Sequence, residues 1–544
     1  MFGVPALTVQ ENRDVRKYLA LHYYVSASPF QRVEEQHLRK AFQICRADVQ
    51  LPSRKDLAGP LLDVVYEEIK LETDKILSDK TKEFTVTTDA WSNVCNQSVI
   101  DFVAVNPQCT LFVSAVFPNQ KRHTTENLVE WLDNVIKTIP ANTSGATTDN
   151  TAANKAMWRT LQKKYPTKFF QGCVCHCLNL LVKDIFRSSS DEVKGPFDDL
   201  VGFAEDCREI VKYFRNHQVE KYELENRQAA QKVKRLVTPA TTRWGTILGC
   251  FETLLSSENI LHAYVMERSY LSDSSDAKQK MKREAIRNTI SKPTFVSQLK
   301  RCIEILKPMC SLITYFQADD IPVSDVFYAF IELPKQYQSL PLNEKTFIEE
   351  RIQERWRFIS GDAHEVGYLL DPRYLGEGMG ESQKQEVENM VTSFPPDDVT
   401  ETTDQRRITL FQELSDFQVY AESEKKNKTL QYKMLPPRFD FDVKKHLELR
   451  KQPHVTVLSF WQRKEKRWPL LQSLAIRVFQ VVVSSSACER SFSNFGFIHT
   501  ELRNKLDKER VKKLVFIRAN WNGGQRRNAE DEDDEDVIVE LGEN

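Results

Sequence analysis

The chain has 544 residues, several times the roughly 150 residues of an ordinary domain, so two or three packed units are expected. Hydrophobic residues make up 41% of it, with 31 Phe and 8 Trp, which excludes a mainly disordered protein. The longest apolar stretch, residues 474–483, contains Arg477 and Gln480 and is far shorter than the ~20 residues that cross a bilayer. We expect a globular protein with no membrane span, and the first residues show no secretory signal.

The net charge of −1 is unevenly distributed along the chain. Residues 529–544 contain nine acids and no Lys or Arg, and removing nine negative charges from −1 leaves +8 on residues 1–528. A basic body with an acidic tail is compatible with a nucleic-acid partner, although charge alone favours an ordinary solvated surface. Like-charge repulsion in the tail favours disorder there.

The first part of the chain is predicted to be helical and then rich in strands. Residues 12–80 have apolar side chains at helical spacing, with breaks near Pro29 and Pro52. The next segments are β-branched or aromatic and are predicted strands, the last two joined as a hairpin by Pro107-Gln108. These strands cover residues 84–89, 99–106 and 110–117.

A helix over 126–139, a strand over 145–148 and a helix over 152–164 follow. This order indicates a mixed α/β layer rather than a bundle or a sandwich. From about residue 178 to 360 the pattern is helical, with Pro308 as a kink or break. Residues 376–440 are predicted to be looser, and the apolar spacing within 471–479 and 511–515 again predicts helix faces.

Two acids follow threonines at the ends of predicted strands: Asp89 in Thr-Thr-Asp-Ala-Trp and Asp149 in Thr-Thr-Asp-Asn. Strand ends at a common sheet edge bring such carboxylates together, and Mg²⁺ takes oxygen ligands of this kind. Two divalent ions ~3.5–4 Å apart can assist phosphodiester cleavage. Spacing alone slightly favours the structural alternatives, in which Asp149 is a helix N-cap and Asp89 closes a turn.

A third acid, Glu489, lies in the segment Ser-Ser-Ser-Ala-Cys-Glu-Arg-Ser-Phe over residues 484–492. The spacing from Ser486 to Glu489 is also that of a capping box, in which the Glu side chain returns to a backbone N–H at the helix start. One carboxylate does not serve both roles well. The orientation of Glu489 therefore discriminates between a site acid and a cap.

Cys173-Val174-Cys175-His176-Cys177 contains zinc-type ligands, but four neighbouring residues do not easily surround one tetrahedral ion. We predict no structural zinc, and a helix start with His176 hydrogen-bonded nearby. Trp244 follows Arg243, and this pair fits either core packing or stacking on an unpaired base with the cation on phosphate.

Together these segments resemble the hAT family of DNA transposases and the host proteins derived from them, over residues 14–521. The resemblance is most specific in the C-terminal stretch, residues 484–493, 502–506 and 514–517, which is similar to the family's dimerisation region. The segment around residues 51–55 resembles an uncharacterised N-terminal domain found in one branch of the family. The Thr-Asp-Ala-Trp and Thr-Asp-Asn segments occur in the family's order.

The resemblance implies an α/β fold: an RNase H-like core interrupted by a large all-α insertion, with helical N-terminal and C-terminal regions. The implied divisions are a helical region over 1–82, the first part of the core over 83–186, a mainly helical insertion with loops over 187–440, the rest of the core with the dimerisation region over 441–521, and an acidic disordered tail over 522–544.

The resemblance also implies residue roles. Asp89, Asp149 and Glu489 match the family's catalytic acids, which hold Mg²⁺ or Mn²⁺ for DNA strand cleavage and transfer. Cys173 and His176 match its Cys-x-x-His motif beside the active site. Arg243 and Trp244 match an Arg-Trp motif that handles a flipped base on DNA.

Two functional hypotheses follow. The first is a hAT-like transposase or transposase-derived DNA-binding protein with a metal-dependent cleavage site. The second is a catalytically inactive, domesticated dimerising protein acting in chromatin or transcription. The acids favour the first, whereas the absence of a BED-type Cys-x-x-Cys and His pattern in this sequence leaves end recognition without an obvious device.

The remaining expectations concern assembly and location. The apolar helix faces within 468–521 exceed what a short segment can bury alone, so we expect at least a dimer, with Leu514 and Val515 in the contact. The alternative is that the segment packs on its own core, and part of it must do so if Glu489 joins the site. We expect DNA as partner, no membrane, and a nuclear location, the last from what the family does and from the weak basic cluster at residues 463–467.

Overall fold

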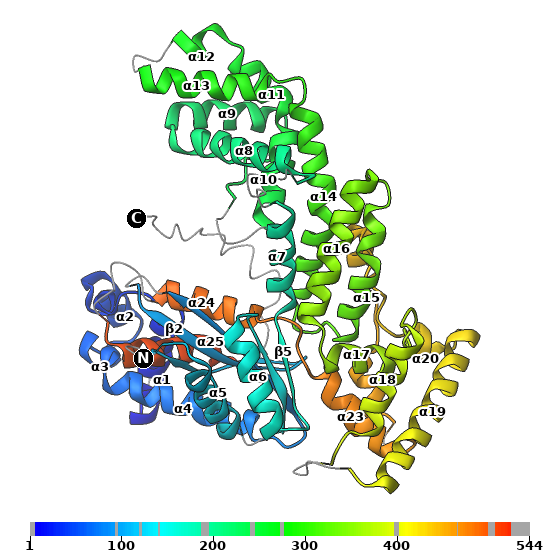
Figure 1. Cartoon of the computed structure of the whole chain (residues 1–544). Coiled ribbons are helices and arrows are strands. Elements are labelled where there is room, and N and C mark those ends of the chain that lie inside the picture. Colours follow the sequence, from blue (N-terminus) through cyan, green and yellow to red (C-terminus); the bar gives the residue numbers. More distant parts are fainter. Residues whose placement is uncertain are drawn as a thin grey trace.

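The protein consists of a sheet-containing part and a large helical part (Figure 1). The computed structural model describes residues 6–92, 96–118, 122–139, 142–186, 195–239, 245–272, 277–396, 402–464, 466–498 and 506–523. The acidic tail, predicted to be disordered, lies almost wholly outside these residues. No helix in the described ranges is both long and apolar enough to span a membrane.

Five strands form one mixed sheet in the order β3-β2-β1-β4-β5. β1, β2 and β3 are antiparallel neighbours, while β4 runs parallel to β1 and β5 parallel to β4. The predicted strands, the hairpin and the mixed α/β layer are confirmed, and β5 is a strand that the sequence pattern did not predict. The strands are β1 (Glu83–Ser92), β2 (Ser98–Val105), β3 (Thr110–Val116), β4 (Asn142–Thr148) and β5 (Phe169–Gly172).

Helices cover both faces of the sheet, which explains why the sequence of β2 is a nearly continuous apolar run. On β2, alternate side chains point to opposite faces. Val99, Val103 and Val105 pack toward α24 (Ser486–Ile498) and α25 (Lys508–Asn520). The intervening residues pack toward α5 (Thr125–Thr138) and α6 (Ala152–Lys164), the helices predicted over 126–139 and 152–164; they are Ile100, Phe102 and Ala104.

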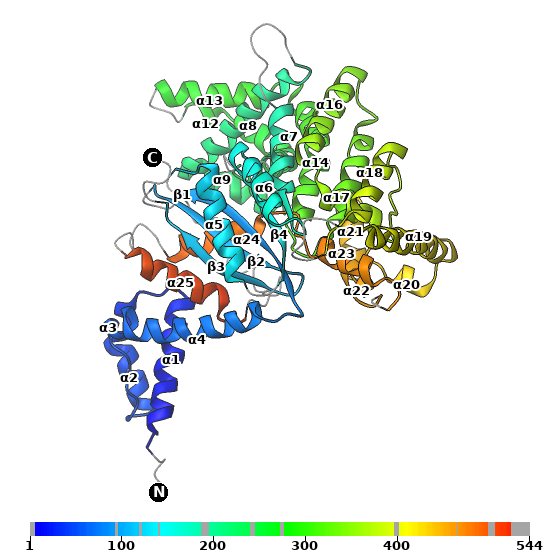
Figure 2. The same ribbon diagram turned by 60° about the horizontal axis from the view of Figure 1, so that its bottom comes forward.

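The N-terminal helices pack on the α25 side of the sheet (Figure 2). The predicted breaks near Pro29 and Pro52 are confirmed, because both prolines lie between helical segments. α4 makes the main contact with α25, and it begins with Pro at its first position, where the missing N–H costs nothing. The segments are α1 (Val9–Val25), η1 (Phe30–Glu34), α2 (Gln36–Cys45), α3 (Arg54–Ala58) and α4 (Pro60–Leu77).

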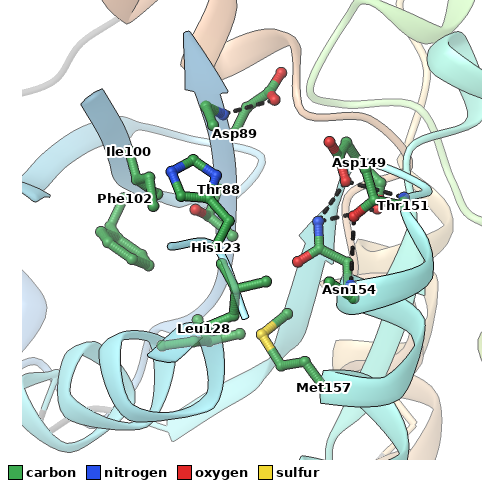
Figure 3. Close-up of a pocket in the computed structure, with 13 residues that line it drawn as sticks. Thr88, Asp89, Ile100, Phe102, His123, Leu128, Asp149, Thr151, Asn154 and Met157 are labelled. Carbon is green, nitrogen blue, oxygen red and sulfur yellow. Dashed lines mark hydrogen bonds between the residues drawn. The ribbon is translucent and has the colours of Figure 1, made fainter. Parts of the chain in front are cut away.

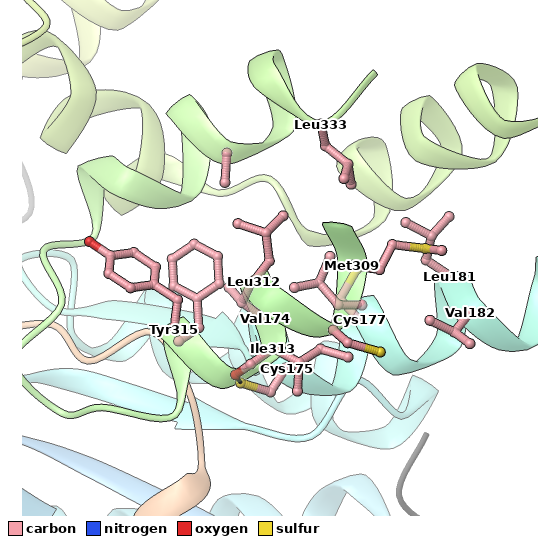
Figure 4. Packing of buried hydrophobic residues seen from close by; sticks show 14 of the residues in the cluster. Val174, Cys175, Cys177, Leu181, Val182, Met309, Leu312, Ile313, Tyr315 and Leu333 are labelled. Atoms are coloured by element: carbon pink, nitrogen blue, oxygen red, sulfur yellow. Dashed lines mark hydrogen bonds between the residues drawn. The ribbon is translucent and has the colours of Figure 1, made fainter. Parts of the chain in front are cut away.

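α7 (Val174–Ile185) connects the sheet to the helical part, since it starts directly after β5. Its apolar face packs against α14 (Phe295–Phe316), where Val174 and Leu181 lie close to Met309 and Ile313 (Figure 4). α14 continues through Pro308, so of the predicted kink or break, a break does not occur.

The helical part extends from α7 to α23 around one large apolar cluster. Its other elements are α8 (Asp198–Asn216), α9 (Gln218–Ala230), α10 (Gly245–Ser256), α11 (Glu258–Val265), α12 (Arg268–Ser272), α13 (Ala277–Ile290), α15 (Ser324–Glu332), η2 (Pro334–Tyr337), α16 (Leu342–Ile359), α17 (Asp362–Leu370), α18 (Glu381–Thr392), α19 (Asp404–Asn427), α20 (Leu430–Lys433), α21 (Val443–Arg450), α22 (Val457–Gln462) and α23 (Pro469–Phe479).

The expectation of a looser region over 376–440 is wrong for most of its length. α18 and α19 lie within it, and α19 has 24 residues. The buried residues of α19 include Leu410, Leu414, Phe417 and Ala421, a narrow stripe on an otherwise mainly polar helix that also exposes a few large apolar side chains. The many charged residues around this stripe led to the prediction of a loose region where a regular helix forms.

Candidate active site

Asp89 and Asp149 line one pocket of about 160 Å³ at the sheet edge (Figure 3). Asp89 lies near the end of β1, and Asp149 directly follows β4, the parallel neighbour of β1. Because the two strands run in the same direction, their carboxyl ends meet at one edge, as the sequence predicted. The pocket is otherwise lined by side chains from β1, β2, α5 and α6 and the turns beside them: Thr88, Ala90, Ile100, Phe102, His123, Leu128, Leu132, Thr151, Ala153, Asn154 and Met157.

Asp149 is not the N-cap of α6. That position belongs to Thr151, whose side chain accepts a hydrogen bond from the backbone N–H of Asn154. Asp149 Oδ1 instead accepts from the Thr151 backbone N–H at 3.1 Å and from the Asn154 side-chain amide. The helix start therefore holds the carboxylate in place without using it as a cap.

Asp89 lies within a strand rather than in a turn, and its Cα partner across the ladder is Asp101 of β2. Its Oδ1 accepts from the Ala90 backbone N–H at 2.8 Å. The pKa of Asp89 is raised well above its usual range, first by burial and then by the negative charge of Asp149, with a smaller effect from Glu489. A carboxyl group whose pKa is raised by burial and by a neighbouring like charge in a cleft is a common mark of functional sites.

Glu489 lies in the first turn of α24, which begins at Ser486. With that start, the residue before the helix is Ser485, whose carbonyl accepts from the Glu489 backbone N–H, so the register does not fit a capping box of Ser486 with Glu489. The charge of Glu489 acts on the pKa of both Asp89 and His176. Its carboxylate is thus within electrostatic range of the pocket that Asp89 and Asp149 line.

The approach of Glu489 depends on residues 480–485, which follow α23 and contact β1, β4 and β5. Thr85 Oγ1 donates to the Gln480 carbonyl at 2.8 Å, and Thr147 Oγ1 donates to the Val482 carbonyl at 2.6 Å. Threonines in β1 and β4 thus bind a segment that is 395 and 335 residues away in sequence. This contact brings the start of α24 to the edge where the two aspartates lie.

Asp101 is a further acid, fully buried beneath α24. Its Oδ2 accepts from Ser491 Oγ at 2.8 Å, and its Oδ1 has no hydrogen-bond partner among the described residues. Burial raises the pKa of Asp101 to about 8, and the Ser491 hydrogen bond only partly offsets this. Asp101 is therefore protonated, and its hydrogen bond with Ser491 holds α24 against β2. Ser491 lies two residues after Glu489, so this contact also helps to position Glu489.

The Cys-x-x-His segment starts α7 beside the acids. Cys173 is the N-cap of α7, and its Sγ accepts from the backbone N–H groups of His176 and Ser485, both at 3.4 Å. Hydrogen bonding, chiefly from Cys175, lowers the pKa of Cys173 to about 7. Burial lowers the pKa of His176, and Asp149 and Glu489 partly oppose that shift. The motif links the sheet edge, the α24 segment and the helical part.

Sequence reasoning missed two polar residues of the pocket, His123 and Asn154. Asn154 holds Asp149, as described above. His123 precedes α5, and its Nε2 lies 3.0 Å from Ser98 Oγ. The N-cap spacing from Thr151 to Asn154 gave a local signal for the second residue, but nothing near His123 in sequence connects it with the acids.

Two predicted sets of residues are not part of this site. Arg243 and Trp244 lie outside the described residues. Leu514 and Val515 are 4% and 0% exposed and belong to the cluster that joins α25 to the sheet and α4. The expectation that these two side chains contact a partner needs correction, because their own chain already covers them.

The donor set agrees in chemistry with a hard divalent ion, since Asp89 and Asp149 offer carboxylate oxygens in one pocket. Mg²⁺ is commonly bound through one or two carboxylates, with water and substrate phosphate filling the other positions. No cluster of three or more His, Cys, Asp or Glu side chains in ligating positions occurs in the described part of the chain. The protein's own direct ligands in this geometry would be the two aspartates.

Two family models match parts of the chain. Residues 52–196 match a domain of unknown function, DUF659, and residues 437–521 match the hAT family C-terminal dimerisation region. The first covers the end of the N-terminal helices, the sheet and α7. The second extends from the last helices of the helical part to α25. Both therefore meet at the sheet edge described above, in a mixed α/β protein.

Curated relatives include two proteins of Zea mays, described as "Putative AC transposase" and "Putative AC9 transposase". Each is 23% identical to this chain over 94% of its length, and the chain spans 66% of each relative. These matches support a relation of the chain to the hAT family of DNA transposases and transposase-derived proteins.

Proposed function

We propose that the protein is a hAT-type transposase, or a protein derived from one, with a metal-dependent DNA-cleaving site at the sheet edge. The observation that carries the proposal is the shared pocket of Asp89 and Asp149, with Glu489 within electrostatic range of Asp89. In this proposal the mixed sheet is an RNase H-like core and the helices from α7 to α23 are its insertion. The antiparallel β1–β3 unit followed by two parallel strands supports that assignment.

Asp89 and Asp149 would hold Mg²⁺ or Mn²⁺, and Glu489 would complete the site. The bound ion supplies a Lewis acid that activates an attacking oxygen and stabilises the leaving one. The chain's own groups hold the carboxylates in place. The Thr151 N–H and Asn154 amide orient Asp149, the Ala90 N–H orients Asp89, and the Asp101–Ser491 hydrogen bond holds α24 against the sheet.

The proposal includes DNA as substrate, a homo-oligomer formed through the region 437–521, and a nuclear location. The match to a dimerisation region supports the oligomer. The contact surface must differ from the buried pair Leu514 and Val515. Sedimentation of the purified protein as a monomer at micromolar concentration would remove this part of the proposal.

The test is a nicking and strand-transfer assay with supercoiled and linear DNA in Mn²⁺ or Mg²⁺. Wild type should cleave, and Asp149→Asn should lose at least about 100-fold in rate, equivalent to about 2.7 kcal/mol of transition-state stabilisation. Asp199→Asn, which changes an exposed acid of α8, is the matched control and should cleave as wild type does. Equal background rates in wild type and Asp149→Asn would reject the enzyme and leave a non-catalytic DNA-binding or dimerising protein.

A further inference from the structure

A second cleft, of about 630 Å³, lies between α6, the edge strand β5 and the turn from α16 to α17. One face of α6 forms a wall of it, with side chains at helical spacing. These residues are Lys155, Trp158, Arg159, Gln162 and Lys163. Phe170 of β5 and Arg357 of α16 contribute from the other sides. The cleft thus joins the sheet part to the helical part.

The cleft is strongly cationic. Lys155, Arg159, Lys163 and Arg357 line it, against a single acid, Asp362. Lys155 has a structural role, since its Nζ donates to the Phe358 carbonyl at 2.9 Å and lies over that residue's ring. The other three cations are exposed and form no ion pair with any acid in the described ranges. Elsewhere among the described residues, many Lys and Arg side chains form ion pairs with Asp or Glu.

Aromatic rings lie among these cations. Trp158 and Phe170 are half-buried, so part of each ring faces the cleft. Trp158 also connects the cleft with the acids, because its Nε1–H donates to Thr148 Oγ1 at 3.1 Å and Thr148 directly precedes Asp149. A chain bound along α6 would therefore lead to the proposed cleavage site.

We infer that this cleft binds one DNA strand, with its phosphates on Arg159, Lys163 and Arg357 and its bases against Trp158 and Phe170. Cations spaced by one helical turn fit successive phosphates, and flat rings stack on bases of any sequence. An acidic peptide would satisfy the cations but would leave the rings without a matching partner. The inference rests on the proposed function, since it assigns the path of that function's substrate.

The test compares two charge-matched triple variants of the full chain. Arg159→Glu/Lys163→Glu/Arg357→Glu changes the cleft. Arg407→Glu/Lys426→Glu/Lys280→Glu changes three exposed cations on α19 and α13, which likewise lack ion pairs in the described structure. Binding to fluorescent single-stranded and duplex oligonucleotides is measured by anisotropy in EDTA, over a series of salt concentrations.

The cleft variant should bind single-stranded DNA at least tenfold more weakly than wild type, and its log–log salt slope should fall by roughly 2, at ~0.7 per lost phosphate contact. The α19/α13 variant should lose much less. Unchanged affinity and slope in the cleft variant would overturn the inference, and so would equal losses in both variants. An alanine version of the cleft variant, with its thermal midpoint measured, separates lost contacts from misfolding.

Nicking assays on the same samples test the DNA-binding cleft and the proposed cleavage site separately. Cleft-dependent DNA binding without metal-dependent cleavage would reject the proposed enzyme and retain the binding site. Cleavage by wild type with DNA affinity independent of the cleft would reject the binding site and retain the enzyme.

Discussion

Two groups of acids in this protein differ in how their charges are balanced. In the helical part, Asp325 and Asp371 are fully buried, and Arg373 contacts them at 2.6 and 2.7 Å. Tyr374 and Ser324 donate further hydrogen bonds to the same carboxylates. At the sheet edge, Asp89 and Asp149 make no ion pair with any described residue, and the hydrogen bonds they accept come from amide groups.

This is the difference expected between acids that stabilise the fold and acids of the proposed site. A buried acid that serves the fold has its charge matched by a neighbouring cation and hydroxyl groups, as in the Arg373 network. Acids that lie at an open edge without such a cation carry negative charge that their own chain does not neutralise. That charge remains available to a group that binds there. Substitutions at the two places should therefore have opposite consequences for stability and activity.

The Arg373 network should show the greatest loss of stability on substitution. Arg373→Met should lower the free energy of unfolding by about 3–5 kcal/mol, because it leaves two buried carboxylates without their cation. Urea unfolding followed by circular dichroism measures this, with Arg407→Met on the exposed side of α19 as the control. A loss below about 1 kcal/mol would show that the network is not structural.

Leu514→Ala tests whether the sheet part is as tightly packed as the helical part. Its side chain is 4% exposed in the cluster between α25 and the sheet, so the substitution should cost about 2–5 kcal/mol through lost burial and a cavity. Thermal unfolding and sedimentation are measured on the same sample. Dissociation of an oligomer with unchanged subunit stability would contradict the burial of Leu514 in its own chain.

Asp101→Asn should change stability in a pH-dependent way. The folded-state pKa of about 8 lies above that of an unfolded Asp, so wild type loses stability as pH rises from about 4 to 8. The amide cannot ionise, and its carbonyl still accepts from Ser491. In EDTA the variant should match wild type near pH 4 and be on the order of 1–3 kcal/mol more stable near pH 8. Parallel curves for the two proteins would contradict a buried, protonated Asp101.

The smallest expected stability effect is at the site itself. Asp89→Asn should change the free energy of unfolding by less than about 1 kcal/mol, or raise it, because it removes like-charge repulsion and breaks no ion pair. Chemical unfolding in EDTA measures the change. A loss comparable to that of Arg373→Met would mean that Asp89 supports the fold, and the contrast between the two groups would disappear.

The local sequence was sufficient for much of the sheet part. Runs of β-branched residues predicted β1–β3, and threonine before each acid marked the two strand ends. β5 was not predicted, because its four residues are too few for a periodic signal. α19 was not predicted, because its apolar stripe is narrow.

The site could be predicted only in part. The order of Asp89 and Asp149 along the chain was readable, as was their common edge. The threonine contacts that hold residues 480–485 against the sheet connect positions more than 300 residues apart, and no local pattern encodes them. For the same reason the apolar face of α25 suggested a partner, although it is covered by α4 and β3.

In the proposed function, acids from distant segments form one site for a divalent ion. Calorimetric titration of Mn²⁺ into the purified protein tests this directly, with wild type, Asp89→Asn, Asp149→Asn and the control Asp199→Asn. Wild type and the control should show the same saturable binding, and both site variants should lose it. Equal Mn²⁺ binding by all four proteins, or by none, would contradict the account.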